Sequence, residues 1–411
     1  NAPNGSLLED RVSLFAAFLV AISPLQVFYA QELRCYSLFA LSGAVSLWLF
    51  TKALHDNKHT SWMLLSLCLA LSFWNHFLAA WFFICIDLYL LLTFPSSKKY
   101  YLKWAVWHIV AGIACLPVLY LAWQTTEIIN NILYSWIPAP DIKTPFITFK
   151  AFFAGYSPRA WAYWPVFLIC SAFCILGAWR LRRNGRSLLL LTLWTGLAVI
   201  ICALLWRLRS FSYYEIRLFI WSAISASLLA GLGWASLPRA ARLVTAAALL
   251  VLTVPLLADT YAQRIHPVSQ HRLGVRHKAE NRAAAQVLAR LGLPGEPVFH
   301  ASHITLSPFR IYQPDRFQKH VCLRPDQVDG FIAACPNEPQ WRNLDMIPVP
   351  VERLDLDVPS FWLVLSWWEP FEPPQDIIDL ERWFQERFTE VERQTFFAVT
   401  LVRFTKRVPV L

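Results

Sequence analysis

The sequence predicts a mainly α-helical protein, in which a polytopic membrane domain of about nine spans is followed by a small extracytoplasmic α/β domain. Of its 411 residues, 56% are hydrophobic and only 16% are charged, whereas soluble domains have about 25% charged residues. The net charge of +10 is also uneven: residues 1–258 contain 19 basic and 8 acidic residues, and residues 259–411 contain 18 and 19. An excess of positive charge confined to the apolar part indicates a membrane protein and not a nucleic-acid-binding protein.

Most of the spans are visible as separate apolar runs of roughly 17–25 residues, the length that crosses a bilayer. Such runs occupy 12–29, 35–51, 104–123, 161–179, 188–206, 217–236 and 241–258. One further run, Ser61–Phe94, has 34 residues. It fits either one tilted helix or two short helices that turn at Asn75–His76.

The distribution of basic residues favours the two-helix alternative. If Ser61–Phe94 is a hairpin, all clusters of basic residues fall on one side of the membrane, with 12 basic residues there and seven on the other side. A single helix would scatter them over both sides, against the positive-inside rule. The 12 residues are Arg11, Lys52, Lys58, Lys98, Lys99, Lys103, Arg180, Arg182, Arg183, Arg186, Arg239 and Arg242.

This topology predicts an integral multi-pass protein of the plasma (inner) membrane, with residues 1–10 in the cytoplasm. Residues 1–258 form the membrane domain, and residues 259–411 form a soluble domain on the extracytoplasmic, periplasmic side. Because Asn1 is not Met and no span precedes residue 12, we expect that the chain is truncated at its N-terminus.

Beyond Ala258 both types of secondary structure alternate, which predicts an α/β domain. His277–Leu293 has the periodicity of an amphipathic helix, and Asp376–Phe388 resembles a second helix. Short strands are expected at 297–301, 360–365 and 395–404. Cys322 and Cys335 lie in this domain, where a disulfide is chemically permitted, and the sequence leaves that pairing open.

Candidate chemistry lies at the outer ends of the spans, because ionisable groups near lipid are costly unless they are paired or functional. Glu32 stands in a tight outer turn together with Gln31, Arg34 and Tyr36. Polar groups so close to the hydrocarbon are expected to face a cavity. The alternative is an interfacial aromatic belt in which a Glu–Arg pair only fixes the turn.

A second outer cluster combines three arginines with one glutamate: Arg207, Arg209, Glu215 and Arg217. Guanidinium groups bind phosphate in a bidentate manner and stay charged when partly desolvated. A phosphate at the outer leaflet is what a prenyl-phosphate lipid presents. The alternative is that these arginines only snorkel to the interface at helix ends.

The run from Ser23 to Leu38, Ser-Pro-x-x-x-x-Tyr-Ala-Gln-Glu-x-Arg-x-Tyr-Ser-Leu, resembles the "SP…YYxQExRMYxL" signature of bacterial GT-C membrane glycosyltransferases. That superfamily includes the protein O-mannosyltransferases (glycosyltransferase family 39) and the lipid A aminoarabinose transferase. Leu71–Phe77 is similar to the family's "LYTHYF" hairpin, and Tyr214–Leu218 to its "EPRYLLP" segment. The sequence departs from these motifs at Cys35, Asn75 and Ile216, and none of these changes removes a charged group.

The resemblance implies an enzyme that transfers a sugar, a mannose-like hexose or a pentose, with inversion. The donor is a polyprenyl-phosphate sugar, and the acceptor is a lipid, a glycan or a protein at the outer face. Glu32 is then the candidate catalytic carboxylate, which positions or assists the base. The candidate substrate-binding residues are Gln31, Arg34, Tyr36, His76, Arg207, Arg209, Glu215 and Arg217.

Within this set, the resemblance suggests that Arg34 and Arg217 hold the donor phosphate and that Glu215 orients Arg217. His76 would hydrogen-bond a sugar hydroxyl, with a purely structural hydrogen bond as the alternative. The family's main catalytic acid is expected in a segment before Asn1. The sequence shows no clear metal site and no nucleotide motif. We therefore expect no cofactor, and a divalent cation is the alternative left open. The rival function is a lipid or sugar transporter or flippase without transfer chemistry.

Overall fold

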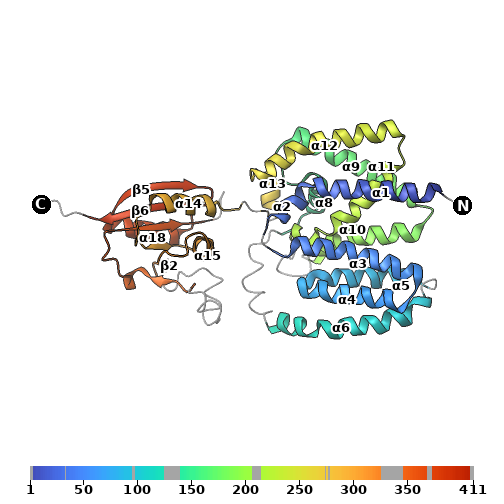
Figure 1. Cartoon of the computed structure of the whole chain (residues 1–411), viewed down its shortest axis with the longest axis horizontal. Helices are drawn as coiled ribbons and strands as arrows, with labels where there is room; N and C mark the ends of the chain where they lie inside the picture. Colours follow the sequence, from blue (N-terminus) through green and yellow to red (C-terminus); the bar gives the residue numbers. More distant parts are fainter. Residues whose placement is uncertain are drawn as a thin grey trace. The chain divides into compact units, whose positions relative to one another are not determined.

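The computed structural model describes residues 3–32, 34–94, 98–124, 139–205, 214–273, 275, 278–324, 346–367 and 373–407. Figure 1 shows a mainly helical chain, with the strands confined to its C-terminal part. The chain divides into two compact units, residues 1–275 and 276–411. The apolar composition ends earlier, near residue 258. The first unit extends beyond this point because it includes the end of a long helix and one further short helix that packs against the other helices of this unit.

The described elements of the first unit are all helical. They are α1 (Pro3–Ile22), α2 (Pro24–Ala30), α3 (Tyr36–Asp56), α4 (His59–Asn75), η1 (Phe77–Ala79), α5 (Ala80–Leu92), η2 (Lys98–Tyr100), α6 (Tyr101–Gln124), α8 (Thr144–Ala154), α9 (Ala160–Leu181), α10 (Gly185–Leu205), η5 (Ile216–Phe219), α11 (Ser222–Ala235), α12 (Arg239–Tyr261) and α13 (Pro267–Leu273).

Five helices of the described chain are long and apolar enough to cross a bilayer: α3, α6 together with η2, α9, α10 and α12. The bent pair α1–α2 raises this number to six. The expected count of nine is therefore not confirmed among the described residues. The difference lies in α4, α5 and α11, which have 17, 13 and 14 residues and are short for a full crossing.

The first expected span is broken and is not one helix. α1 and α2 meet at an angle of 58°. The break follows from the sequence, because Pro24 has no N–H to continue α1 and suits the first turn of a new helix. Ser23 caps that new helix by accepting a hydrogen bond from the Gln26 N–H at 3.4 Å.

The run Ser61–Phe94 does form two helices, as the distribution of charge predicts. α4 ends at Asn75, and His76 adopts an extended backbone conformation. The His76 Nδ1 atom accepts the Leu78 N–H at 3.2 Å and so caps η1, which leads into α5.

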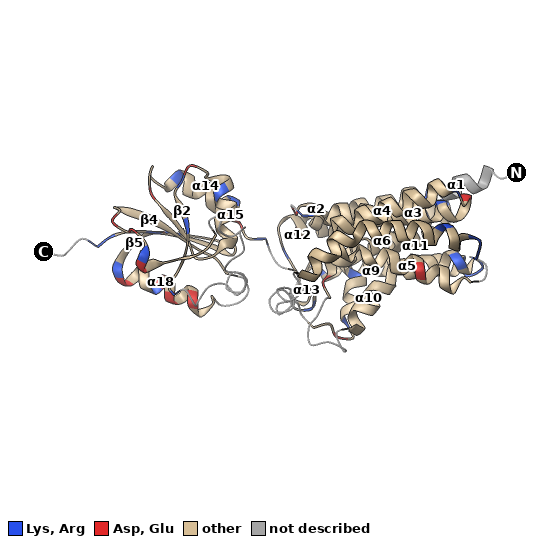
Figure 2. Ribbon diagram, turned by 90° about the horizontal axis from the view of Figure 1, so that it is seen from below, with Lys and Arg blue, Asp and Glu red and all other residues tan. Residues whose placement is uncertain are grey.

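The basic clusters lie at one end of the helical unit, where α1 begins (Figure 2). Contacts join the segments that carry them: the Lys103 Nζ atom donates to the Asn57 carbonyl, and the Trp234 indole donates to the Arg242 carbonyl at 3.1 Å. Arg186 acts electrostatically on Tyr89, near the end of α5. A single charged end of this kind is what a membrane protein with a topological charge bias requires.

The second unit is an α/β domain built on a six-stranded sheet with the order β3-β2-β1-β4-β6-β5. The first four strands in this order pair in parallel, and β6 pairs antiparallel with both β4 and β5. Its elements are α14 (Asn281–Leu291), β1 (Val298–His300), α15 (His303–Tyr312), β2 (Gln318–Cys322), β3 (Val349–Pro350), η7 (Val351–Arg353), β4 (Ser360–Leu365), α18 (Gln375–Arg387), β5 (Phe388–Phe396) and β6 (Val399–Lys406).

The sequence predicts this domain incompletely. The expected strand 360–365 coincides with β4, and α14 and α18 occupy most of the expected helices. The expected strand 395–404 contains most of β6, but its start is wrong, because it runs back into β5 across a tight turn in which Ala398 has a φ of 57°. Cys335 lies outside the described residues, so the expected pairing with Cys322 does as well.

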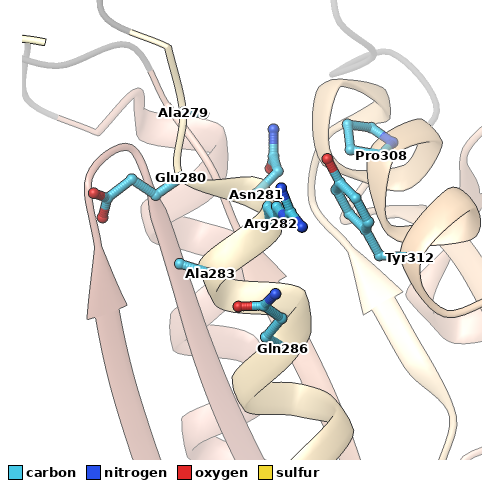
Figure 3. A pocket seen from close by; sticks show the side chains of 8 residues that line it. All are labelled: Ala279, Glu280, Asn281, Arg282, Ala283, Gln286, Pro308 and Tyr312. Carbon is cyan, nitrogen blue, oxygen red and sulfur yellow. The ribbon is translucent and has the colours of Figure 1, made fainter. Parts of the chain in front are cut away.

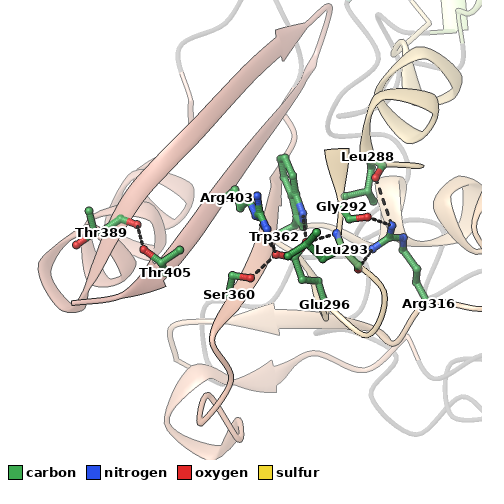
Figure 4. Close-up of polar contacts among 10 residues, drawn as sticks. All are labelled: Leu288, Gly292, Leu293, Glu296, Arg316, Ser360, Trp362, Thr389, Arg403 and Thr405. Atoms are coloured by element: carbon green, nitrogen blue, oxygen red, sulfur yellow. Dashed lines mark hydrogen bonds and ion pairs between the residues drawn. The ribbon is translucent and has the colours of Figure 1, made fainter. Parts of the chain in front are cut away.

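One buried carboxylate organises the centre of the sheet (Figure 4). Glu296 is 5% exposed and accepts hydrogen bonds from the Ser360 hydroxyl, the Trp362 indole at 3.0 Å and the Arg403 guanidinium at 2.5 Å. Burial acts to raise the pKa of Glu296, but these hydrogen bonds outweigh it and lower that pKa. Because both carboxylate oxygens of Glu296 accept hydrogen bonds from this domain, its role is structural.

Candidate active site at the turn between α2 and α3

The turn between α2 and α3 lies at the end of the helical unit opposite the basic clusters, because it stands at the start of α3 and Lys52 stands near its end. The Ser-Pro pair of the signature anchors this turn. The Ser23 hydroxyl donates to the Phe152 carbonyl of α8 at 3.0 Å. Gln26 donates to the Ile220 carbonyl at 3.0 Å, which ties α2 to the segment after η5.

Glu32 and Arg34 stand in a tightly closed backbone turn. The Glu32 N–H donates to the Tyr29 carbonyl at 3.2 Å, and the Arg34 N–H donates to the Glu32 carbonyl at 2.8 Å. Glu32 is half-buried, and its Oε2 atom is buried without a hydrogen-bond partner among the described residues. A buried carboxylate oxygen without a donor is costly in a folded protein, so it marks a place where a ligand hydroxyl is expected.

Glu215 and Arg217 form an ion pair that faces this turn. Arg217 Nη2 lies 2.5 Å from Glu215 Oε1, and both side chains are largely buried. The Arg217 guanidinium also lies 5.3 Å from the centre of the Tyr36 ring. Burial raises the pKa of Glu215, and the neighbouring Arg217 opposes this effect. Glu32 and Arg34 both act electrostatically on Glu215, so segments about 180 residues apart in the sequence share one electrostatic site.

Aromatic rings form one wall of the site. Tyr29 packs edge-to-face on Tyr36 with ring centres 5.5 Å apart, and the Tyr156 hydroxyl donates to the Tyr29 hydroxyl at 3.1 Å. The His76 ring stacks on Phe39 at 4.8 Å. Because His76 Nδ1 already caps η1, the structure gives this residue a structural hydrogen bond, and any contact with a sugar falls to its other ring nitrogen.

Tyr156 is a site residue that sequence reasoning did not identify. It follows Gly155, whose φ of 60° is unfavourable for other residues and whose Cα packs against Pro24. Asp259 holds the same turn by accepting the Ser157 hydroxyl at 2.6 Å and the Arg159 Nε–H at 2.9 Å. The only sequence signal was the glycine itself, between the apolar runs 104–123 and 161–179.

The remaining expected site residues differ in their placement. Gln31 is exposed, and its backbone N–H caps the end of α2. Arg207 and Arg209 lie outside the described residues. In the described part of the chain, no group of three or more His, Cys, Asp or Glu side chains is arranged to hold a metal ion, so no ligand set can be assigned to the divalent cation.

The second unit has a groove of its own, between α14 and α15 (Figure 3). Its volume is about 460 Å³. The Glu280 carboxylate points away from the groove and accepts the Phe397 N–H at 3.1 Å. Arg282 is the other charged residue among the described residues that line the groove. The lining residues are Ala279, Glu280, Asn281, Arg282, Ala283, Gln286, Pro308 and Tyr312.

Comparison with known proteins identifies no family for this chain. No protein-family model matches the chain, and no curated protein matches it with significance.

Proposed function

We propose that this chain belongs to a GT-C-type membrane glycosyltransferase that moves a sugar from a polyprenyl-phosphate donor to an acceptor hydroxyl. The observation that carries the proposal is the electrostatic interaction between Glu32 and Glu215, the partner of Arg217, at the end opposite the basic clusters. Under the positive-inside rule that end faces the periplasm of an inner-membrane protein. A carboxylate and a fixed guanidinium at the outer interface suit a reaction on a lipid phosphate.

The reaction needs two kinds of group. The acceptor oxygen attacks the anomeric carbon and forms the new glycosidic bond, while the bond from that carbon to the phosphate oxygen breaks. The hydroxyl proton passes to a carboxylate base, and the bond electrons leave with the polyprenyl phosphate, whose charge cations stabilise. Attack opposite to the leaving phosphate inverts the anomeric centre.

The residues divide between these two tasks. Glu32, with an unpartnered Oε2 atom among the described residues, would accept a hydrogen bond from the acceptor or from the base. Arg217 would bind the donor phosphate, and Glu215 fixes its guanidinium in place through the 2.5 Å ion pair. Arg34 is exposed at the same turn and would supply a second cation for the phosphate.

The decisive variant is Glu32→Gln, which keeps the size of the side chain and removes its charge. In proteoliposomes with radiolabelled polyprenyl-phosphate mannose or pentose, we expect release of polyprenyl phosphate to fall by about 100-fold or more. Asp56→Asn, at the opposite end of α3, is the control and should leave turnover unchanged. Wild-type turnover in Glu32→Gln would remove Glu32 from the mechanism.

Phosphate binding is tested separately with Arg217→Lys and Arg217→Ala. Loss of a bidentate contact with phosphate should raise the donor KM by about tenfold, which corresponds to about 1.4 kcal/mol, and leave the acceptor KM nearly constant. An unchanged donor KM in Arg217→Ala would contradict this role. Transport of the intact lipid-linked sugar across the vesicle without cleavage would instead support a transporter or flippase.

A further inference from the structure

Lys150 is a buried cation at the same end of the helical unit, and it lies outside the proposed transfer site. It stands in α8, is only 7% exposed, and its Nζ atom lies 4.0 Å from the centre of the Tyr163 ring. Among the described residues, Lys150 forms no side-chain hydrogen bond and no ion pair. Burial alone lowers the pKa of Lys150 to about 8, which means that no described acid compensates its charge.

Two acidic residues at this end, Asp259 and Asp141, are already paired with arginines. Asp259 is held by Arg159 and Arg264, and Asp141 pairs with Arg272. Lys150 therefore has no acidic partner among the described residues, whereas these arginines have one. A contact with an aromatic ring offsets only part of the cost of burying a lone charge.

Two hydrogen-bond donors lie on the segment that packs against α8. The His266 Nδ1 atom accepts the Val268 N–H at 3.1 Å, so the proton of the neutral ring sits on Nε2. The imidazole packs against Tyr163, the same ring that carries the Lys150 ammonium, and Lys150 acts electrostatically on it. In α13, which packs against α8, Ser269 is 1% exposed and its hydroxyl has no hydrogen-bond partner among the described residues.

We propose that Lys150, together with His266 and Ser269 of the segment that packs against α8, binds a phosphate group at the membrane interface. A tetrahedral phosphate accepts several hydrogen bonds at once and is the anion that a cationic ammonium, an N–H and a hydroxyl suit together. The phosphate is supplied either by a lipid head group or by a free phosphate. This site does not depend on the transfer reaction, since it shares no residue with Glu32, Arg34, Glu215 or Arg217.

The test is competitive acetylation of the whole protein in nanodiscs by trace acetic anhydride, with the modification of each lysine measured by mass spectrometry. Lys143 is the internal control, because it is exposed and lies seven residues before Lys150. Phosphatidic acid in phosphatidylcholine discs should slow acetylation of Lys150 by about tenfold relative to Lys143, equivalent to about 1.4 kcal/mol. Equal slowing of the two lysines overturns the proposal.

A parallel arm distinguishes the two sources of phosphate. Inorganic phosphate is added to discs of phosphatidylcholine alone. Protection in this arm supports the site and shows that the head group is sufficient, whereas protection by phosphatidic acid only supports the site and assigns it to a membrane lipid. Absence of specific protection in both arms overturns it.

Variants give a second measurement that does not depend on lysine chemistry. Lys150→Met should reduce the phosphatidic acid that is retained in native mass spectra, whereas Lys143→Met should not, and Lys150→Arg should retain it. Lys150→Met is also expected to fold, because it removes an uncompensated buried charge. Retention equal to that of wild type in Lys150→Met contradicts the proposal, and if that variant does not fold, the acetylation of the wild-type protein still decides.

Discussion

Asp259 has no exposed surface, and its carboxylate holds Ser157, Arg159 and Arg264 at the turn that carries Tyr156. Asp259→Asn should lower the free energy of unfolding by about 1–3 kcal/mol, because it leaves donors without their charged acceptor. The two arginines are partly exposed and remain hydrated, which limits the loss. Thermal unfolding in detergent measures it.

Asp141→Asn is the matched control, since Asp141 is exposed and its pair with Arg272 lies at the surface. A surface ion pair is worth at most about 1 kcal/mol. Equal losses of stability in the two variants would show that burial of Asp259 does not decide its contribution.

Glu296 makes the stability of the second unit depend on pH. Its pKa is lowered in the folded state, so its stabilising effect is complete above the pKa of an unfolded glutamate and is lost as the pH falls through the lowered value. Amide protection in β4, measured by hydrogen exchange in the whole protein and corrected for intrinsic rates, should therefore decrease below about pH 4.5.

The variant Glu296→Gln should remove most of this pH dependence and lower protection at pH 7 by about 3 kcal/mol. Asp357→Asn is the control, because Asp357 is exposed and pairs with Lys406 at the surface. The hypothesis is wrong if Glu296→Gln keeps the acid sensitivity of the wild type.

Three residues show which parts of the candidate site could be predicted from the sequence. Glu32 and Arg217 were found because an ionisable group next to lipid needs a reason, and the structure places them at one site. Their roles in transfer stay predictions. Tyr156 was not found because its neighbours in space, Tyr29 and Pro24, are more than 120 residues away, and a tyrosine in an aromatic loop carries no local signal.

At the scale of elements, the pair α9–α11 depends on two glycines. A Cβ atom on Gly233 would lie 2.0 Å from the Phe173 carbonyl oxygen, and one on Gly177 would lie 2.1 Å from the Leu229 carbonyl oxygen. Small residues at such a crossing allow the helix backbones to touch, which is how helices associate in membranes.

Gly233→Ala should therefore push α9 and α11 apart and lower the unfolding free energy by about 1–3 kcal/mol. Gly112→Ala in α6 meets no atom within 4 Å and should be neutral or stabilising by up to about 1 kcal/mol. Thermal unfolding of both variants in the same detergent makes the comparison. A destabilised Gly112→Ala with an unaffected Gly233→Ala would contradict this account of the packing.

Among the elements, the break at Ser23–Pro24 was not predicted, because hydropathy alone joined α1 and α2 into one span. The turn at Asn75–His76 was found through the distribution of lysines and arginines, not through hydropathy. In the second unit, β2 was missed because it begins with the polar residues Gln318, Lys319 and His320, and β3 was missed because it has only two residues.

At the scale of the whole molecule, the charge asymmetry of the sequence and the geometry of the helical unit agree. All basic clusters of the long helices lie at one end (Figure 2), and the turn between α2 and α3, which carries Glu32, lies at the other. The sequence alone predicts the sidedness of each loop, because charge bias is counted along the chain. It did not give the contact between α2 and the segment after η5, which depends on the bend at Pro24 and on hydrogen bonds such as that from Gln26 to Ile220.

This sidedness leads to a topological prediction. Lys99 in η2 is exposed at the basic end, and Lys143 before α8 is exposed at the end of the proposed site. In intact cells, a membrane-impermeant maleimide should label Lys143→Cys and should label Lys99→Cys only after permeabilisation. Because native cysteines are present, labelling is measured for each peptide by mass spectrometry. The reverse pattern would place Glu32 and Arg217 in the cytoplasm, where an acceptor at the outer face is out of reach, and the proposed transfer reaction would fail with it.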